Sequence, residues 1–126
     1  RNKLTNIYDR EINKSSFLKS LKKQKNQNLS IWKHITIIKN SKIKREVLQN
    51  ELRKKYGINI NWAYDPPLHL QTVYKNLYKK KFKRLEKTVK LMSKHFHLPL
   101  HMNISVSDAK YISKCLISCC EKFVKR

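Results

Sequence analysis

At 126 residues the chain is long enough for one folded domain and too short for a second core. Apolar residues make up 40% of it, close to the globular norm, which excludes a disordered tail. Thirty Lys and Arg against eight Asp and Glu give a net charge of +22, so an anionic partner is expected. Nucleic acid is favoured over a membrane, because no segment joins a strong apolar face to an aromatic anchor.

Other features of the composition bear on origin. Lysine exceeds arginine, and asparagine and isoleucine are abundant, as in proteins from AT-rich genomes; that bias does not explain the small number of acids. Three cysteines indicate no disulfide framework and a reducing compartment. Because residue 1 is Arg, we expect a chain that is trimmed or part of a longer one, with any targeting signal lost.

The N-terminal third predicts a helix, a loop and a strand. Helical spacing of apolar residues predicts a helix from Arg1 to Lys14, and Phe17 to Leu21 is expected to add a turn. Residues 19–28 are expected to form a basic surface loop. The β-branched and aromatic run from Ile31 to Ile38 predicts a strand.

The middle of the chain predicts a helix followed by a second strand. Lys42 to Tyr56 carries one apolar face, after a possible cap at Asn40 or Ser41. Gly57 stands where a helix ends in the left-handed conformation. Ile58 to Trp62 alternates apolar and polar residues, which predicts a strand.

The C-terminal half predicts helices and one extended piece. The prolines after Asp65 stop the second strand, and Leu68 to Tyr78 is read as a short helix or an irregular segment. Residues 79–94 form the most basic stretch, with a helical apolar stripe. His97 to His101 predicts a short strand, and Ser105 or Ser107 caps a helix to Val124, whose inward residues are Tyr111, Ile112, Cys115, Leu116 and Cys119.

Basic side chains are the main candidates for contacts with nucleic acid, because phosphate neutralisation requires many exposed cations. The alternative is a solvated surface enriched in lysine by genome bias. No recognised RNA-binding or helix-turn-helix motif is present, so sequence specificity is not predicted. The candidate contacts are Lys19, Lys22, Lys23, Lys25, Lys75, Lys79, Lys80, Lys81, Lys83, Arg84 and Lys87.

Histidines, cysteines and tryptophans are interpreted structurally. A zinc site formed by His95, His97 and His101 with the cysteines is one interpretation. Buried cysteines and exposed histidines are favoured, so no metal is predicted. For His69 a packed, hydrogen-bonded core position is favoured over a substrate pocket. Trp32 and Trp62 are expected to share a core, with base stacking as the alternative.

Short motifs in chain order resemble the C-terminal small domain of the DegT-type sugar aminotransferases, which belong to the aspartate-aminotransferase superfamily of pyridoxal-phosphate enzymes. They comprise a basic N-terminal helix, a Trp-containing strand, Gly-Ile after a helix, the sequence PLHLQ from Pro67 to Gln71, and LPLH from Leu98 to His101. The resemblance implies an α/β (α+β) domain over residues 1–126, with helices covering a small mixed sheet of about three strands. Ile31 to Ile38, Ile58 to Trp62 and the HLPLH segment would form that sheet.

The departures from the family pattern concern catalysis. The family's cofactor lysine and phosphate-binding residues belong to a large domain that this chain does not contain. The family's His before Tyr64 is Ala63 here, and the family's acid before LPLH falls on Val89. The resemblance leaves Tyr64 and His69 as remnants of a substrate pocket. No lysine stands in a context that predicts the cofactor lysine, so the chain alone is expected to be non-catalytic and without a cofactor.

Charge and resemblance together lead to a main hypothesis and an alternative. The main hypothesis is a non-catalytic RNA-binding subunit of a mitochondrial ribosome, in the organelle matrix, built on a reduced aminotransferase domain. Its expected partners are rRNA and neighbouring ribosomal proteins, with no membrane and no small-molecule substrate. The alternative is the C-terminal portion of an active sugar aminotransferase whose large domain lies outside this chain. A third reading is a basic adaptor for an acidic protein.

Overall fold

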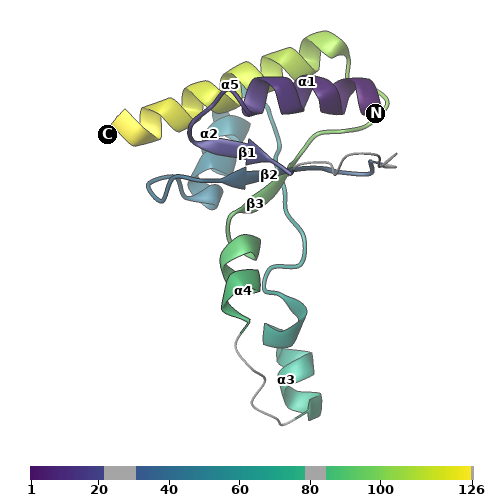
Figure 1. The fold of residues 1–126 in the computed structure, drawn as a ribbon, viewed down its shortest axis with the longest axis vertical. Coiled ribbons are helices and arrows are strands. Elements are labelled where there is room, and N and C mark those ends of the chain that lie inside the picture. The colour runs from purple at the N-terminus through teal and green to yellow at the C-terminus, as the bar shows by residue number, and fades with distance from the viewer. Residues whose placement is uncertain (22–30, 79–84, 126) are drawn as a thin grey trace.

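The structure is a computed structural model that describes residues 1–21, 31–78 and 85–125. Figure 1 shows a body, made of a small sheet and the helices packed on it, from which a narrow arm projects. The body comprises α1 (Asn2–Ile12), β1 (Leu18–Ser20), β2 (His34–Ile38), α2 (Arg45–Tyr56), β3 (His95–Leu98) and α5 (Val106–Lys125). The arm comprises the 3-10 turn η1 (Leu68–Leu70), α3 (Thr72–Tyr78) and α4 (Glu86–Met92).

The sheet has three strands in the order β1-β2-β3, and both pairings are antiparallel. The predicted α/β class and three-strand sheet are therefore confirmed, but the sheet is antiparallel where a mixed one was expected. β1 lies where a helical turn was predicted from Phe17 to Leu21. Its backbone pairs with β2, with Leu18 opposite Ile38, and Leu18 and Ser20 are buried while Lys19 is exposed. Strand pairing thus decides the conformation of this short segment.

The predicted strand from Ile58 to Trp62 is not a strand of the sheet. It forms one isolated bridge, between Asn61 and His97, at the outer side of β3. The side chain of Gln49 on α2 donates to the Ile60 carbonyl oxygen at 2.6 Å. A helix side chain therefore makes the hydrogen bond that a neighbouring strand would make in a sheet. The third strand is β3, which begins two residues before the predicted HLPLH segment.

The helices of the body follow the sequence pattern closely. α1 and α5 pack against one another over the sheet, and α2 packs against α5. Gly57 ends α2 at φ 66°, as predicted. Ser105 caps α5: its Oγ accepts from the Asp108 backbone N–H at 3.1 Å, and Asp108 Oδ2 accepts from the Ser105 N–H at 2.8 Å.

The hydrophobic core formed by the described residues lies in the body. Tyr8, Leu48, Phe96 and Leu116 are fully buried in it. The three cysteines are free and buried, as predicted, with Cys119 and Cys120 fully enclosed. Tyr111, which was expected to face inward, is half-exposed on the outer side of α5.

The predicted shared core of Trp32 and Trp62 is also wrong. Trp32 precedes β2 and is 65% exposed, with the Lys33 ammonium 4.3 Å from the centre of its ring. Trp62 is half-buried under the guanidinium of Arg45, 3.9 Å away. Each indole therefore packs against a cationic side chain, and the two indoles do not share a core.

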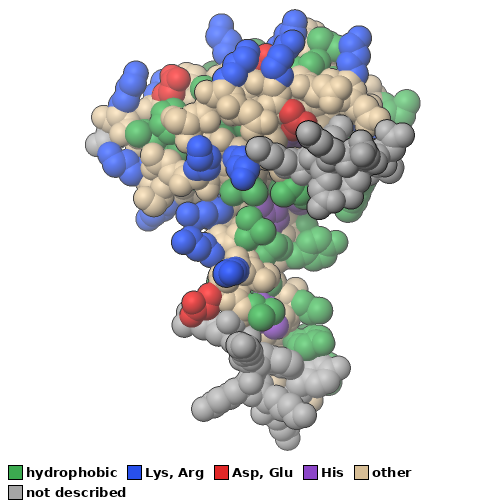
Figure 2. Space-filling model, viewed as in Figure 1, with side chains coloured by type: hydrophobic (Ala, Val, Ile, Leu, Met, Phe, Trp, Pro, Cys, Tyr) green, Lys and Arg blue, Asp and Glu red, His purple; other side chains and the backbone are tan. Residues whose placement is uncertain are grey.

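The arm has no such core. No residue of η1, α3 or α4 whose side chain is described is buried. Large apolar side chains are exposed along the arm, and Figure 2 shows hydrophobic side chains at its surface. They are Leu68, Val73, Leu77, Leu85 and Leu91. No helix in the described parts of the chain combines the length and apolar character that crossing a membrane requires.

Candidate functional site

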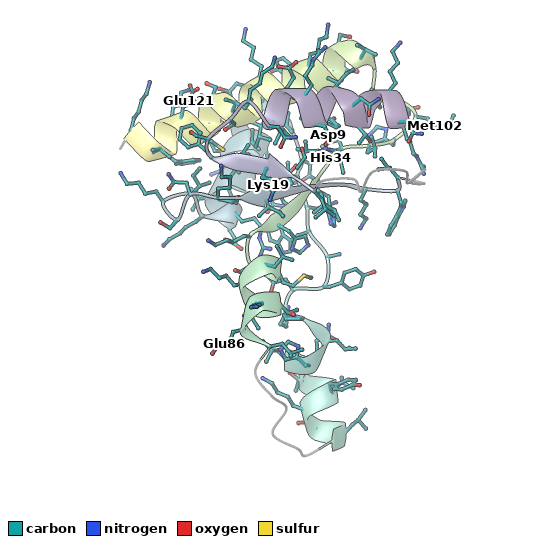
Figure 3. The ribbon with its side chains drawn as sticks, viewed as in Figure 1. Asp9, Lys19, His34, Glu86, Met102 and Glu121 are labelled. Atoms are coloured by element: carbon teal, nitrogen blue, oxygen red, sulfur yellow. The ribbon has the colours of Figure 1, made fainter. Side chains whose placement is uncertain are left out.

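A buried hydrogen-bonded chain fixes α1 on β2 and orients the strand. His34 Nε2 lies 2.9 Å from Asp9 Oδ1, and its Nδ1 lies 3.3 Å from Thr36 Oγ1 (Figure 3). Burial lowers the pKa of His34, although the Asp9 carboxylate opposes that shift. In the neutral ring, Nε2–H donates to Asp9 and Nδ1 accepts from Thr36. Thr36 is fully buried, so this chain holds the fold together and offers no nucleophile to a substrate.

The two faces of β2 differ. His34, Thr36 and Ile38 are buried, whereas Ile35 and Ile37 are only half-buried on the opposite face. Opposite Ile35 and Ile37 on β3 lie His97 and His95. This second face is therefore lined by isoleucines and histidines and is not covered by a helix of the body (Figure 1). Two pockets, described below, are lined in part by residues of this face.

Arg45 joins the arm to the body at the first residue of α2. It is 5% exposed, and its NH1 donates to the carbonyl oxygens of Met92 at 2.8 Å and His95 at 3.2 Å. Its NH2 pairs with Asp65, on the other chain segment that enters the arm. One guanidinium thus holds both segments at the base of the arm, which requires the planar, multidentate geometry of arginine.

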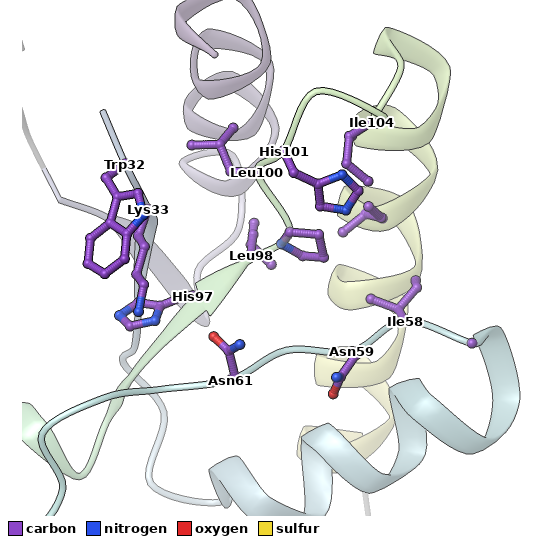
Figure 4. A pocket seen from close by; sticks show the side chains of 13 residues that line it. Trp32, Lys33, Ile58, Asn59, Asn61, His97, Leu98, Leu100, His101 and Ile104 are labelled. Carbon is purple, nitrogen blue, oxygen red and sulfur yellow. The ribbon is translucent and has the colours of Figure 1, made fainter. Parts of the chain in front are cut away.

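The first candidate site, here called the polar pocket, has a volume of about 520 Å³ (Figure 4). Trp32 and Lys33 form one side, and Asn59 and Asn61 lie on the extended segment after α2. His97 lies at the end of β3. The remaining wall comes from residues 98–101, from Ile104 just before α5, and from Ile112 in α5. The pocket therefore combines an indole, an ammonium group, amides and imidazoles.

The charges of the polar pocket are not balanced within the described structure. Lys33 is half-buried and meets the Trp32 ring, but none of the ion pairs among the described residues includes it. His97 is 7% exposed, and its Nδ1 is buried without a hydrogen-bond partner among those residues. Burial, with Lys33 and His95 nearby, lowers the pKa of His97 to about 4, so its ring is neutral at pH 7.

The second site, here called the apolar pocket, has a volume of about 370 Å³ and shares Trp32, Lys33 and His97 with the polar pocket. Ile35, Ile37 and Leu91 line the remainder with Tyr64. Tyr64 is 71% exposed and has φ 61°, a conformation that is uncommon outside glycine. The start of the arm thus presents the tyrosine ring at the rim of the apolar pocket.

The predicted pocket remnants fall in different places. Tyr64 lines the apolar pocket, whereas His69 lies in η1 and lines neither pocket. His69 is half-buried, and its buried Nε2 has no partner among the described residues, so it is not the hydrogen-bonded core histidine that was favoured. His95 and His97 are buried where exposed histidines were expected, and only His101 is exposed. No described cluster of His, Cys, Asp or Glu is arranged to hold a metal ion.

The predicted basic contacts are only partly described. Lys19, Lys75 and Lys87 are exposed on β1, α3 and α4, three separate elements. The others lie outside the described residues: Lys22, Lys23, Lys25, Lys79, Lys80, Lys81, Lys83 and Arg84. Figure 2 shows Lys and Arg side chains spread over the visible face of the body and down the arm.

The sequence reasoning missed the residues that carry the site. Lys33, Asn61 and Arg45 were not singled out, and His97 was considered only as a member of a zinc site. For Lys33 a signal existed, because it falls in the predicted strand from Ile31 to Ile38 and alternates there with Ile35 and Ile37, which predicts a shared face. For Arg45 the signal is an arginine in a chain whose cations are mostly lysine.

Comparison with known proteins defines the family. The sequence profile of the DegT/DnrJ/EryC1/StrS aminotransferase family matches residues 1–117, so the chain belongs to this family. No curated protein sequence matches the chain.

Solved structures share the fold. A putative sugar aminotransferase, Spr1654 from Streptococcus pneumoniae, is 27% identical, with a TM-score of 0.83 over 97% of this chain and 30% of its own. The aminotransferase TlmJ from Streptoalloteichus hindustanus is 17% identical, with a TM-score of 0.82 over 98% of this chain and 31% of its own. Helicobacter pylori PseC, an aminotransferase of pseudoaminic acid biosynthesis, is 16% identical, with a TM-score of 0.81 over 96% and 32%. The chain therefore spans about a third of these proteins.

These findings correct the main functional hypothesis. The family match and the sugar aminotransferase neighbours contradict an RNA-binding, ribosomal, mitochondrial protein. The inference failed because net charge describes a surface and its solubility, whereas function depends on a particular site. A charge of +22 can be carried by a fold whose function is unrelated to RNA.

Proposed function

We propose that the chain is the small domain of a pyridoxal-phosphate-dependent sugar aminotransferase and works together with a large domain that carries the cofactor lysine. The observation that supports this best is the extent of the match. The family profile covers residues 1–117, and nearly the whole fold superimposes on about a third of a sugar aminotransferase. A basic binding module with an unrelated origin would not match over its whole length.

The described residues by themselves do not fit the cofactor. Its pyridine nitrogen needs a charged partner such as Asp or Arg, and its aldehyde needs a positioned lysine. Among the described residues, Lys33 is the only lysine that lines either the polar or the apolar pocket, and no Asp, Glu or Arg lines them. These groups would have to come from the large domain, so we assign no catalytic step to this chain.

The surfaces left open in the described structure support the same proposal. The second face of the sheet carries Ile35 and Ile37, and the arm exposes leucines and a valine that a folded protein normally covers. A large domain seated on this side would bury the apolar pocket and the arm. The small domain would then form a wall of the cleft, exclude water and hold the sugar.

The test uses the native gene product that contains this chain. We expect a polypeptide about three times as long, with the absorbance band of bound pyridoxal phosphate and amino transfer to a keto sugar. Coexpression of the chain with a separately encoded large domain, followed by copurification, covers the case of two polypeptides. A native product that neither contains nor binds a large domain, and shows no cofactor absorbance, would refute the proposal.

A further inference from the structure

Lys33 has no anionic partner among the described residues. A half-buried ammonium group is normally compensated by a carboxylate, because removal from water costs free energy that an ion pair offsets. All eight Asp and Glu lie in the described residues, and none of the ion pairs formed among those residues includes Lys33. Its ammonium group lies over the Trp32 ring, 4.3 Å from the ring centre.

The polar groups beside Lys33 can form further hydrogen bonds. His97 is more than nine-tenths buried, yet its Nδ1 has no partner among the described residues. Its backbone is fixed by the bridge to Asn61, where the two N–H groups donate to carbonyl oxygens at 2.6 and 3.4 Å. Figure 4 shows Lys33 extending from beside Trp32 towards His97, with Asn61 below them. Backbone pairing thus fixes the positions of His97 and Asn61 without a ligand.

We infer that the polar pocket binds the oxyanion of a small molecule, a phosphate or a carboxylate, at Lys33 and His97. The Lys33 ammonium supplies the charge, and the imidazole of His97 and the amide of Asn61 supply hydrogen bonds. The volume of about 520 Å³ leaves room for the rest of the molecule between Trp32 and the wall of residues 98–104. This inference does not depend on the proposed large domain, because every group in it belongs to this chain.

The test measures anion binding by the 126-residue chain at constant ionic strength. Constant ionic strength is essential because a protein of charge +22 attracts every anion. Inorganic phosphate, pyrophosphate and acetate are titrated against chloride, with Trp32 fluorescence as the signal and W32F to assign it. We expect one saturable site for at least one of these oxyanions. Preference among the three separates a phosphate site from a carboxylate site.

Two lysine variants decide whether the site is the one inferred. Lys33→Gln should weaken binding at least about tenfold, the size expected for one charge-assisted contact. Lys39→Gln removes the same charge from an exposed residue just after β2 and should leave the affinity unchanged. Lys33→Arg keeps the charge and should retain most of the affinity.

Several outcomes would overturn the inference. Equal losses in Lys33→Gln and Lys39→Gln would show a general charge effect and no site. Wild-type affinity in Lys33→Gln, or no saturable response to any of the three anions, would also exclude it. Circular dichroism of each variant, together with Lys33→Arg, separates a lost contact from a lost fold.

Discussion

The body and the arm are similar in amino-acid composition but differ in how they are stabilised. Both are rich in lysine and both carry regularly spaced apolar residues. In the body those residues meet across the sheet and the helices α1, α2 and α5, and Tyr8, Leu48 and Leu116 are fully buried. In the arm Val73 and Leu77 remain about 70% exposed. An apolar stripe therefore predicts burial only when another element is present to cover it.

The largest difference should appear when matched leucines are removed. Leu48→Ala in α2 deletes a fully buried side chain, and we expect a loss of about 2–5 kcal/mol in the free energy of unfolding. Leu77→Ala in α3 should change it by less than about 0.5 kcal/mol, because that side chain is already exposed. Urea denaturation of the two variants measures both values. Equal losses would mean that the arm belongs to the same cooperative core.

The junction of the two regions depends on Arg45. Arg45→Met should reduce the free energy of unfolding by about 2 kcal/mol, because Asp65 and two carbonyl oxygens lose a charged donor. Amide hydrogen exchange should accelerate in the arm more than in α5. Arg53→Met, at an exposed position of the same helix, is the control. Unchanged exchange in the arm would contradict the role given to Arg45.

Helix capping contributes a smaller difference in stability between the body and the arm. α5 begins with the reciprocal bonds between Ser105 and Asp108, whereas α4 of the arm has Leu85 at its N-cap and no side-chain cap. Ser105→Ala should cost about 1 kcal/mol of unfolding free energy, measured by urea denaturation. Ser107→Ala should cost only a few tenths, since its hydroxyl meets the Ser105 hydroxyl and caps no backbone N–H. A Ser105 variant as stable as wild type would exclude the cap.

A pH dependence of stability should originate in the sheet of the body. Burial lowers the pKa of both His34 and His97, the latter to about 4, against about 6.5 for an unfolded histidine. The unfolded chain binds more protons in that interval, so stability should fall as the pH drops from about 6.5 towards 4. His97→Asn should make this slope shallower than in wild type. An identical slope in urea midpoints between pH 7 and pH 4.5 would contradict it.

Local signals in the sequence were reliable where a residue's own chemistry decides the conformation. Gly57 ends α2, Ser105 starts α5, and the long apolar periodicity of α5 produced a helix close to the predicted one. The family resemblance was also readable from PLHLQ and LPLH, and the family match confirms it. The candidate site was not predictable in this way, because Lys33, Asn61 and His97 come from three separate segments.

The sequence by itself determined the α/β class, the main helices of the body and membership in the aminotransferase family, because these follow from local periodicity, caps and short motifs. Only the tertiary structure decided that residues 18–20 are a strand, that Ile58 to Trp62 is held by Gln49, and that Trp32 and Trp62 face cations. Only the tertiary structure placed Lys33 beside His97 without a carboxylate. Pairing, burial and charge compensation depend on residues far apart in the chain, and no local pattern encodes them.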